Sequence, residues 1–67
     1  MKVTVREIKY SFQGIEVQDT KYENVKRIIF DYEYNTDYGE ERPVFRLVYE
    51  EVTATFWQEY TQIELEN

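Results

Sequence analysis

The sequence contains no cysteine and no histidine. Without cysteine, disulfide bonds and thiolate metal sites are excluded. Without histidine, the commonest general base and the commonest transition-metal ligand are missing. Ser11 is the only serine and has no histidine to activate it, and the two glycines are too few for a phosphate-binding loop. We therefore expect a protein that is not an enzyme and that uses no cofactor and no metal.

Long apolar runs are also absent. No stretch approaches the roughly 20 apolar residues that a membrane-spanning helix needs, and the N-terminal residues lack the apolar centre of a signal peptide. We therefore expect a cytoplasmic protein that does not enter a membrane. Because the chain has 67 residues, a single domain over 1–67 is predicted.

Basic residues are few and unevenly placed. The net charge is −6, from 14 acids and 8 bases. Residues 1–30 carry six bases and four acids, whereas residues 31–67 carry two bases and ten acids. Nucleic-acid binding needs clustered lysine and arginine, so direct binding to nucleic acid is not expected. The acidic half suits a basic protein partner, because its negative electrostatic field would attract such a partner at long range. The same acidity could have no role beyond keeping the protein soluble.

Aromatic and β-branched residues are what the chain has in quantity. It holds seven tyrosines, four phenylalanines and one tryptophan, and each buried ring removes about 150–250 Å² from water. Segments rich in Val, Ile, Thr, Tyr and Phe are typical of β-strands. The sequence predicts an all-β protein: a small antiparallel sheet or a partly open barrel of four to five strands, with room for one short helix.

The strongest pattern lies in residues 25–34 and 43–52, which are predicted to form an antiparallel hairpin. One register gives an apolar face and two opposite-charge pairs at once. It pairs Tyr32 with Phe45, Phe30 with Leu47, Ile28 with Tyr49, Ile29 with Val48, Val25 with Val52, Asp31 with Arg46, and Arg27 with Glu50. A capping-box pattern at residues 20–23 leaves a short helical turn near residues 20–24 as an alternative.

A second hairpin is predicted at the N-terminus, with a turn at Gln13-Gly14 that pairs Phe12 with Ile15 and Tyr10 with Val17. Its alternation is imperfect, because Val3 and Val5 fall on the face opposite Ile8, Tyr10 and Phe12. Either a bulge near Glu7 corrects the phase, or both faces are covered.

The C-terminal stretch, residues 53–65, is compatible with a strand or a helix, and its threonines favour a strand. It either continues the preceding strand as one long, bent strand or begins a fresh hairpin. Several predicted strands are apolar on both faces, and a short chain offers no second layer to cover them. We therefore expect a homo-oligomer, or a partner held through a sheet face or edge.

The acids and tyrosines of the second half favour a protein-binding module, an inhibitor or adaptor that docks on a basic, nucleic-acid-binding surface of a partner. In size and charge alone the chain resembles small acidic proteins of bacteriophages that occupy such surfaces. The alternatives are a small-molecule or nucleotide-sequestering protein with an aromatic-lined pocket, and a self-assembling structural component. The predicted partner-binding residues are Tyr34, Asp37, Tyr38, Glu40, Glu41, Glu59 and Glu64. Calcium at Asp37, Glu40 and Glu41 is disfavoured, because their spacing misses the EF-hand pattern.

Overall fold

Six β-strands and one short 3-10 turn make up the structure, a computed structural model that describes residues 1–66. The elements are β1 (Lys2–Ser11), β2 (Gly14–Tyr22), β3 (Arg27–Asn35), β4 (Glu40–Val48), β5 (Thr53–Trp57), η1 (Gln58–Tyr60) and β6 (Thr61–Glu66). They form two three-stranded antiparallel sheets, in the orders β2-β1-β6 and β3-β4-β5. The prediction of an all-β fold is confirmed, with six strands instead of four to five. No helix within the described residues is long and apolar enough to cross a membrane.

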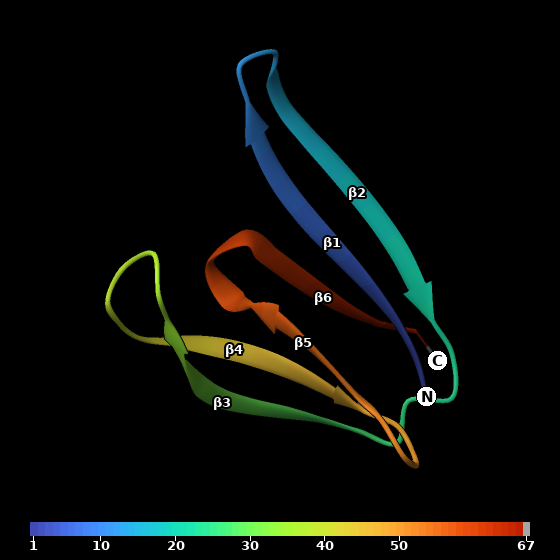
Figure 1. The fold of residues 1–67 in the computed structure, drawn as a ribbon. Coiled ribbons are helices and arrows are strands. Elements are labelled where there is room, and N and C mark those ends of the chain that lie inside the picture. The colour runs from blue at the N-terminus through green and yellow to red at the C-terminus, as the bar shows by residue number, and fades with distance from the viewer. Residues whose placement is uncertain (67) are drawn as a thin grey trace.

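The two sheets converge at one end and separate at the other (Figure 1). The N-terminus, the end of β6, the β2–β3 connection and the β4–β5 turn lie at the converging end, whereas the tip of the β1–β2 hairpin and the β3–β4 loop lie far from it (Figure 1). The element η1 joins the two sheets, because it leads the chain from the edge strand β5 into the edge strand β6. The two sheets therefore share one small core and leave much of their length uncovered.

The core lies where the sheets converge. Its fully buried members are Val3, Val5, Val25 and Leu47. Partly buried side chains pack around them: Tyr22, Ile28, Tyr49, Ala54, Phe56 and Ile63. Val25 exchanges two hydrogen bonds with Met1, through its backbone amide at 3.1 Å and its carbonyl at 2.7 Å. The predicted pairing of Val25 with Val52 is therefore wrong, because Val25 anchors the N-terminus instead.

The β3–β4 hairpin keeps the predicted faces but not the predicted pairs. Phe30 lies opposite Phe45 and not Leu47, and the whole ladder is displaced by two residues from the predicted register. The connection sets this register, because Asn35 pairs with Glu40 and leaves a four-residue loop. A displacement of two residues returns every side chain to the same face of the sheet. The predicted division of side chains between the two faces therefore survives an incorrect pairing.

Of the two opposite-charge pairs predicted in this hairpin, one forms and the other does not. Arg46 Nε lies 3.3 Å from Asp31 Oδ2, so this ion pair forms, although the two residues are diagonal neighbours and not direct partners. The predicted pair of Arg27 with Glu50 is wrong, because β4 ends at Val48 and Glu50 lies in the following turn. Both differences follow from the same two-residue displacement.

The β1–β2 hairpin shows the same displacement. Tyr10 lies opposite Ile15, and the turn is Phe12-Gln13 instead of Gln13-Gly14. The Ser11 hydroxyl starts the turn early, because it accepts from the backbone amide of Gln13 at 3.2 Å and donates to the Gly14 carbonyl at 3.3 Å. Gly14 then takes a positive φ of 120°, a conformation that side chains disfavour.

Residues 53–65 adopt neither a helix nor one bent strand. A tight turn, in which the Tyr49 amide donates to the Val52 carbonyl at 2.9 Å, begins a fresh hairpin from β4 into β5. The strand then breaks at η1 and resumes as β6. The alternative of a helical turn at residues 20–24 is wrong, because β2 continues to Tyr22 and Asn24 takes a left-handed φ of 62°.

Candidate functional site

The β3–β4 loop is held by the side chain of Asn35, which is only 6% exposed. Its Oδ1 accepts hydrogen bonds from the backbone amides of Asp37 at 2.9 Å and Tyr38 at 3.4 Å. Its carbonyl accepts from the Gly39 amide at 2.8 Å, and Gly39 has a left-handed φ of 67°. Asparagine at the start and glycine at the end are the residues that such a turn requires. The loop therefore presents Asp37 and Tyr38 from a fixed backbone.

Arg42 is the centre of a cluster beside this loop. Its guanidinium lies over the Tyr38 ring, 4.0 Å from the ring centroid. Its Nη2 donates to Glu40 at 2.9 Å and its Nη1 lies 3.5 Å from Glu59. Its Nε is buried and has no hydrogen-bond partner among residues 1–66. Arg42 of the same chain therefore already neutralises two of the acids predicted to bind a partner, Glu40 and Glu59.

Tyr60, at the end of η1, joins the loop to the first sheet. Its hydroxyl is hydrogen-bonded to the Tyr38 hydroxyl at 2.5 Å, and its ring meets the Tyr10 ring edge to face, with centroids 6.3 Å apart. Tyr10, Tyr60 and Tyr38, from β1, η1 and the β3–β4 loop, thus form one line of contacting side chains. We call it the tyrosine row.

The hydrogen bond between Tyr38 and Tyr60 in the tyrosine row leads to a prediction about how stability depends on pH. Hydrogen bonding to Tyr38 is the main cause that raises the pKa of Tyr60 from about 10 to about 12. Because the folded state holds this proton more tightly, the resulting stability is complete below about pH 10 and is lost as the pH rises through about 12. In an absorbance titration at alkaline pH we expect one tyrosine to ionise late. Tyr38→Phe should lower the pH of that late transition, whereas Tyr32→Phe should leave it unchanged.

An unaltered late transition in Tyr38→Phe would show that the bond between the two hydroxyls does not hold the Tyr60 proton. Tyr32 serves as the matched control because its ring is also exposed and lies on β3, away from η1.

The structure gathers most of the predicted partner-binding residues at one end of the molecule. Tyr38, Glu40 and Glu59 surround Arg42, as described above. Asp37 lies in the same loop, and Glu41 is the second residue of β4, directly opposite Tyr34. The Tyr34 hydroxyl lies 4.0 Å from the position that a side chain on Gly39 would take, so Tyr34 also borders the loop.

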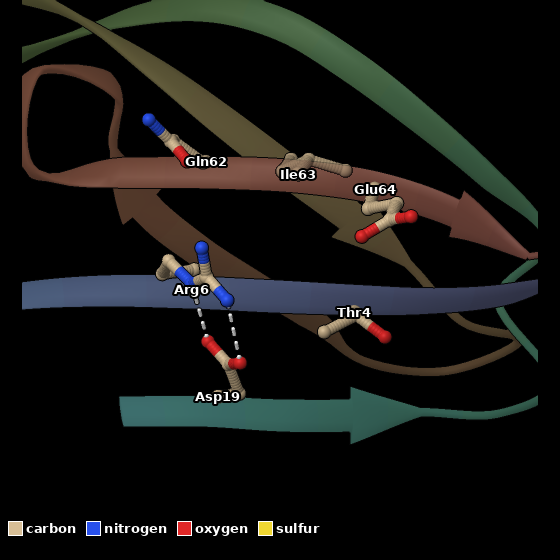
Figure 2. A pocket seen from close by; sticks show the side chains of 6 residues that line it. All are labelled: Thr4, Arg6, Asp19, Gln62, Ile63 and Glu64. Carbon is tan, nitrogen blue, oxygen red and sulfur yellow. Dashed lines mark hydrogen bonds and ion pairs between the residues drawn. The ribbon is translucent and has the colours of Figure 1, made fainter. Parts of the chain in front are cut away.

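Glu64 lies elsewhere, in a polar hollow of about 100 Å³ on the first sheet (Figure 2). In this hollow Arg6 of β1 reaches Asp19 of β2 with two hydrogen bonds, of 2.8 and 3.0 Å. The bond from Arg6 lowers the pKa of the Asp19 carboxyl. Since Arg6 is occupied by Asp19, the hollow is a satisfied surface network. Glu64 does not lie with the loop residues, because it pairs with Thr4 on β1.

The unpaired acids of the second half define the charge of the surface. Its two bases are occupied, Arg42 as above and Arg46 by Asp31 and Glu33. Within residues 1–66, five acids of this half form no ion pair: Asp37, Glu41, Glu50, Glu51 and Glu64. Asp37 precedes Tyr38 in the β3–β4 loop, and Glu41 lies opposite Tyr34, on the face of β4 that Arg42 does not occupy. The described residues contain no group of three or more acids arranged to hold a metal ion.

A separate apolar groove, of about 600 Å³, lies between the edge strands β3 and β6. Its walls include Ile28, Phe30 and Phe45 on one sheet and Ile63 and Leu65 on the other. The Phe30 and Phe45 rings meet edge to face at 5.2 Å. The groove contains no acid of the predicted partner-binding set, so it is a distinct surface.

Comparisons of the chain with protein-family models, curated proteins and solved structures find no significant match. The functional argument therefore comes from the surface itself. Sequence reasoning missed Tyr10, Tyr60 and Arg42 as members of the site.

Proposed function

We propose that this protein is a small binding module that docks on a basic surface of a partner protein through the tyrosine row and the acids beside it. The observation that carries the proposal is the meeting of Tyr10, Tyr60 and Tyr38, the last of which shares the β3–β4 loop with the unpaired Asp37. The unpaired Glu41 follows this loop in β4, opposite Tyr34. Tyrosine is enriched at interfaces because it supplies a large contact area and a hydroxyl from a side chain with few rotatable bonds.

The internal contacts of Arg42 support arginine as the chemistry to be recognised. That side chain stacks on Tyr38 and binds two carboxylates, which is how a planar guanidinium is held best. Neighbouring rings and acids offer the same chemistry to an arginine of a partner. Tyr38 and Tyr10 are 46% and 65% exposed, so their rings are accessible.

The net charge of −6 supports the same proposal through kinetics. An acidic molecule attracts a basic partner at long range and raises the association rate, and salt screens this attraction. An inhibitor of a nucleic-acid-binding protein would gain from this, because its target carries a basic surface. The proposed module would bind the protein and not the nucleic acid.

The experiment uses a fluorescent arginine-rich peptide as the probe and compares two double variants of equal net charge. Asp37→Lys/Glu41→Lys changes the unpaired acids of the β3–β4 loop and of the start of β4, and Glu50→Lys/Glu51→Lys changes two unpaired acids in the β4–β5 turn. We expect the first variant to weaken binding about tenfold or more, a change of about 1.4 kcal/mol. The second should weaken it only through the overall field, by a factor of about two. Fluorescence anisotropy measures both.

Equal weakening by the two variants would contradict the proposal, since it would mean that net charge alone attracts the peptide. Binding of the wild-type protein should also fall when salt is raised, because the contacts are charged. If the wild-type protein had no affinity for the peptide at low salt, the proposal that this surface recognises arginine would be contradicted.

The apolar groove between β3 and β6 favours a second candidate function, the binding of a small apolar molecule. Its volume of about 600 Å³ lies within the range of ligand sites, and Phe30 and Phe45 line it. The two functions are separable, because charge reversal at Asp37 and Glu41 does not alter the groove.

A further inference from the structure

The outer half of the β1–β2 hairpin has no third strand beside it. β6 pairs with β1 only from Lys2 to Glu7, whereas the β1–β2 ladder continues to Ser11 and Gly14. Figure 1 shows this outer half rising away from the rest of the molecule. A two-stranded hairpin alone is marginally stable in water, and a third strand or a packed face is needed to hold it.

The outer half also carries its apolar side chains on the face opposite the core. The ladder runs without a bulge, so Val3 and Val5 remain on one face and Ile8 and Tyr10 on the other. The predicted correction of phase by a bulge near Glu7 is therefore wrong. The apolar pattern changes face along the strand, and no strand among residues 1–66 covers the outer apolar face, which the Tyr60 ring meets at Tyr10.

Four side chains on this face, with the turn residue, form what we call the hairpin patch: Ile8, Tyr10, Ile15, Val17 and Phe12. Ile8 pairs with Val17 and Tyr10 pairs with Ile15, so these four are direct neighbours. Ile15 and Val17 are 66% and 56% exposed, and Phe12 is fully exposed.

The size of the hairpin patch is enough for an interface with a second copy. With aromatic side chains of about 150–250 Å² each, it exposes roughly 500 Å² per copy. Two copies would bury about 1,000 Å², which is the lower limit for a specific interface. Exposed apolar patches of a few hundred Å² or more usually mark interaction sites.

The charge of the hairpin patch favours a second copy of the chain over a basic partner as its occupant. Residues 8–18 hold one base and one acid, Lys9 and Glu16, which pair directly across the ladder on the face opposite the patch. The patch is therefore neutral in a molecule of charge −6. A basic partner gains nothing electrostatic here, whereas two copies can meet without bringing their acidic halves together. A patch that is apolar throughout is also self-complementary, as a two-fold interface requires.

We propose that a second copy of this chain covers the hairpin patch, in a two-fold dimer formed by the outer halves of the two β1–β2 hairpins. The dimer packs Ile15 and Val17 of each copy against the other and supports the strands that β6 does not reach. Tyr10 belongs to both the hairpin patch and the tyrosine row. In the dimer the second copy covers the Tyr10 ring, whereas Tyr38 and Asp37 stay open to the partner, so dimerisation also sets two partner-binding surfaces close together.

The test is sedimentation velocity from about 5 to about 500 μM, where a dimer of this small area should dissociate in the range of roughly 10–100 μM. Val17→Lys places a charge in the patch and should raise the dimer dissociation constant at least tenfold. Gln18→Lys is the matched control: it makes the same charge change on the next residue of β2, on the opposite face. It should leave the dissociation constant within about twofold of the wild type.

Circular dichroism confirms the fold of each variant. If Val17→Lys does not fold, Ile15→Thr replaces it, because threonine keeps the β-branched side chain that suits a strand. A wild-type protein that is monomeric at the highest concentration overturns the proposal. Equal dissociation constants for the Val17 and Gln18 variants overturn it too, because the interface would then lie elsewhere.

The response to salt distinguishes the proposed dimer from the proposed binding of a basic partner. The dimer should be unchanged or tighter at high salt, because salt screens the repulsion between two acidic copies. Binding of the arginine-rich peptide should weaken in the same conditions. A dimer that dissociates as salt is added would overturn the apolar interface and leave the partner-binding proposal standing.

Discussion

Replacing Leu47 with alanine is expected to leave much of the protein unfolded at 25 °C. Leu47 is fully buried at the centre of the only core cluster among the described residues. Truncation of a buried leucine costs about 2–5 kcal/mol, because the lost contacts leave a cavity. A single core in a domain of this size rarely supplies more than about 3–5 kcal/mol of stability. The loss is therefore comparable to the whole free energy of unfolding.

Leu65→Ala is the matched control for this prediction, because it makes the same chemical change on β6 at a side chain that is 60% exposed. Its cost should stay below about 1 kcal/mol. Urea unfolding followed by circular dichroism gives both free energies. Similar losses for the two variants would mean that the core does not lie where the sheets converge.

The strands could be predicted because they depend on local composition and on alternation. Segments rich in Val, Ile, Thr and aromatic residues became strands in every case, including residues 53–57 and 61–66, where a helix competed. The register could not be predicted from alternation. A period of two is unchanged by a displacement of two residues, and both hairpins are displaced by that amount.

Side chains in the turns decide the register. Ser11 and Asn35 each hydrogen-bond to the backbone of the turn that follows, and the two residues are the last of their strands. Such local bonds compete with continuation of the ladder. The polar residue at the start of each turn was therefore the available signal, and it outweighs the apolar pairing that the sequence suggests.

The site could be predicted in part for a related reason. The β3–β4 loop carries its own signals, in Asp37-Tyr38-Gly39, and it lies within the connection predicted between residues 34 and 43, at residues 36–39. The contact between Tyr10 and Tyr60 depends on the pairing of the first and last strands and on η1. That 3-10 turn contains no glycine or proline, so no local residue indicated a break in the strand there.

Asn35→Ala is expected to destabilise the protein by about 1–3 kcal/mol and to weaken binding of the arginine-rich peptide. The substitution removes the Oδ1 that accepts from the amides of Asp37 and Tyr38, in a side chain that is almost fully buried. The two hydrogen bonds contribute about 0.5–1.5 kcal/mol each, and both are lost. Because the same bonds fix the loop, Tyr38 should lose its contacts with Arg42 and Tyr60.

Asn35→Asp is the rescue variant, since its carboxylate can accept from the same two amides and aspartate also favours this kind of turn. We expect it to recover more than half of the stability and of the peptide affinity that Asn35→Ala loses. Urea unfolding and fluorescence anisotropy on the same three proteins separate the two effects. If stability falls in Asn35→Ala while peptide affinity does not, the loop is a structural element of the hairpin and the tyrosine row does not depend on it. If both fall and both recover in Asn35→Asp, one buried acceptor connects the turn that sets the register with the surface that binds the partner.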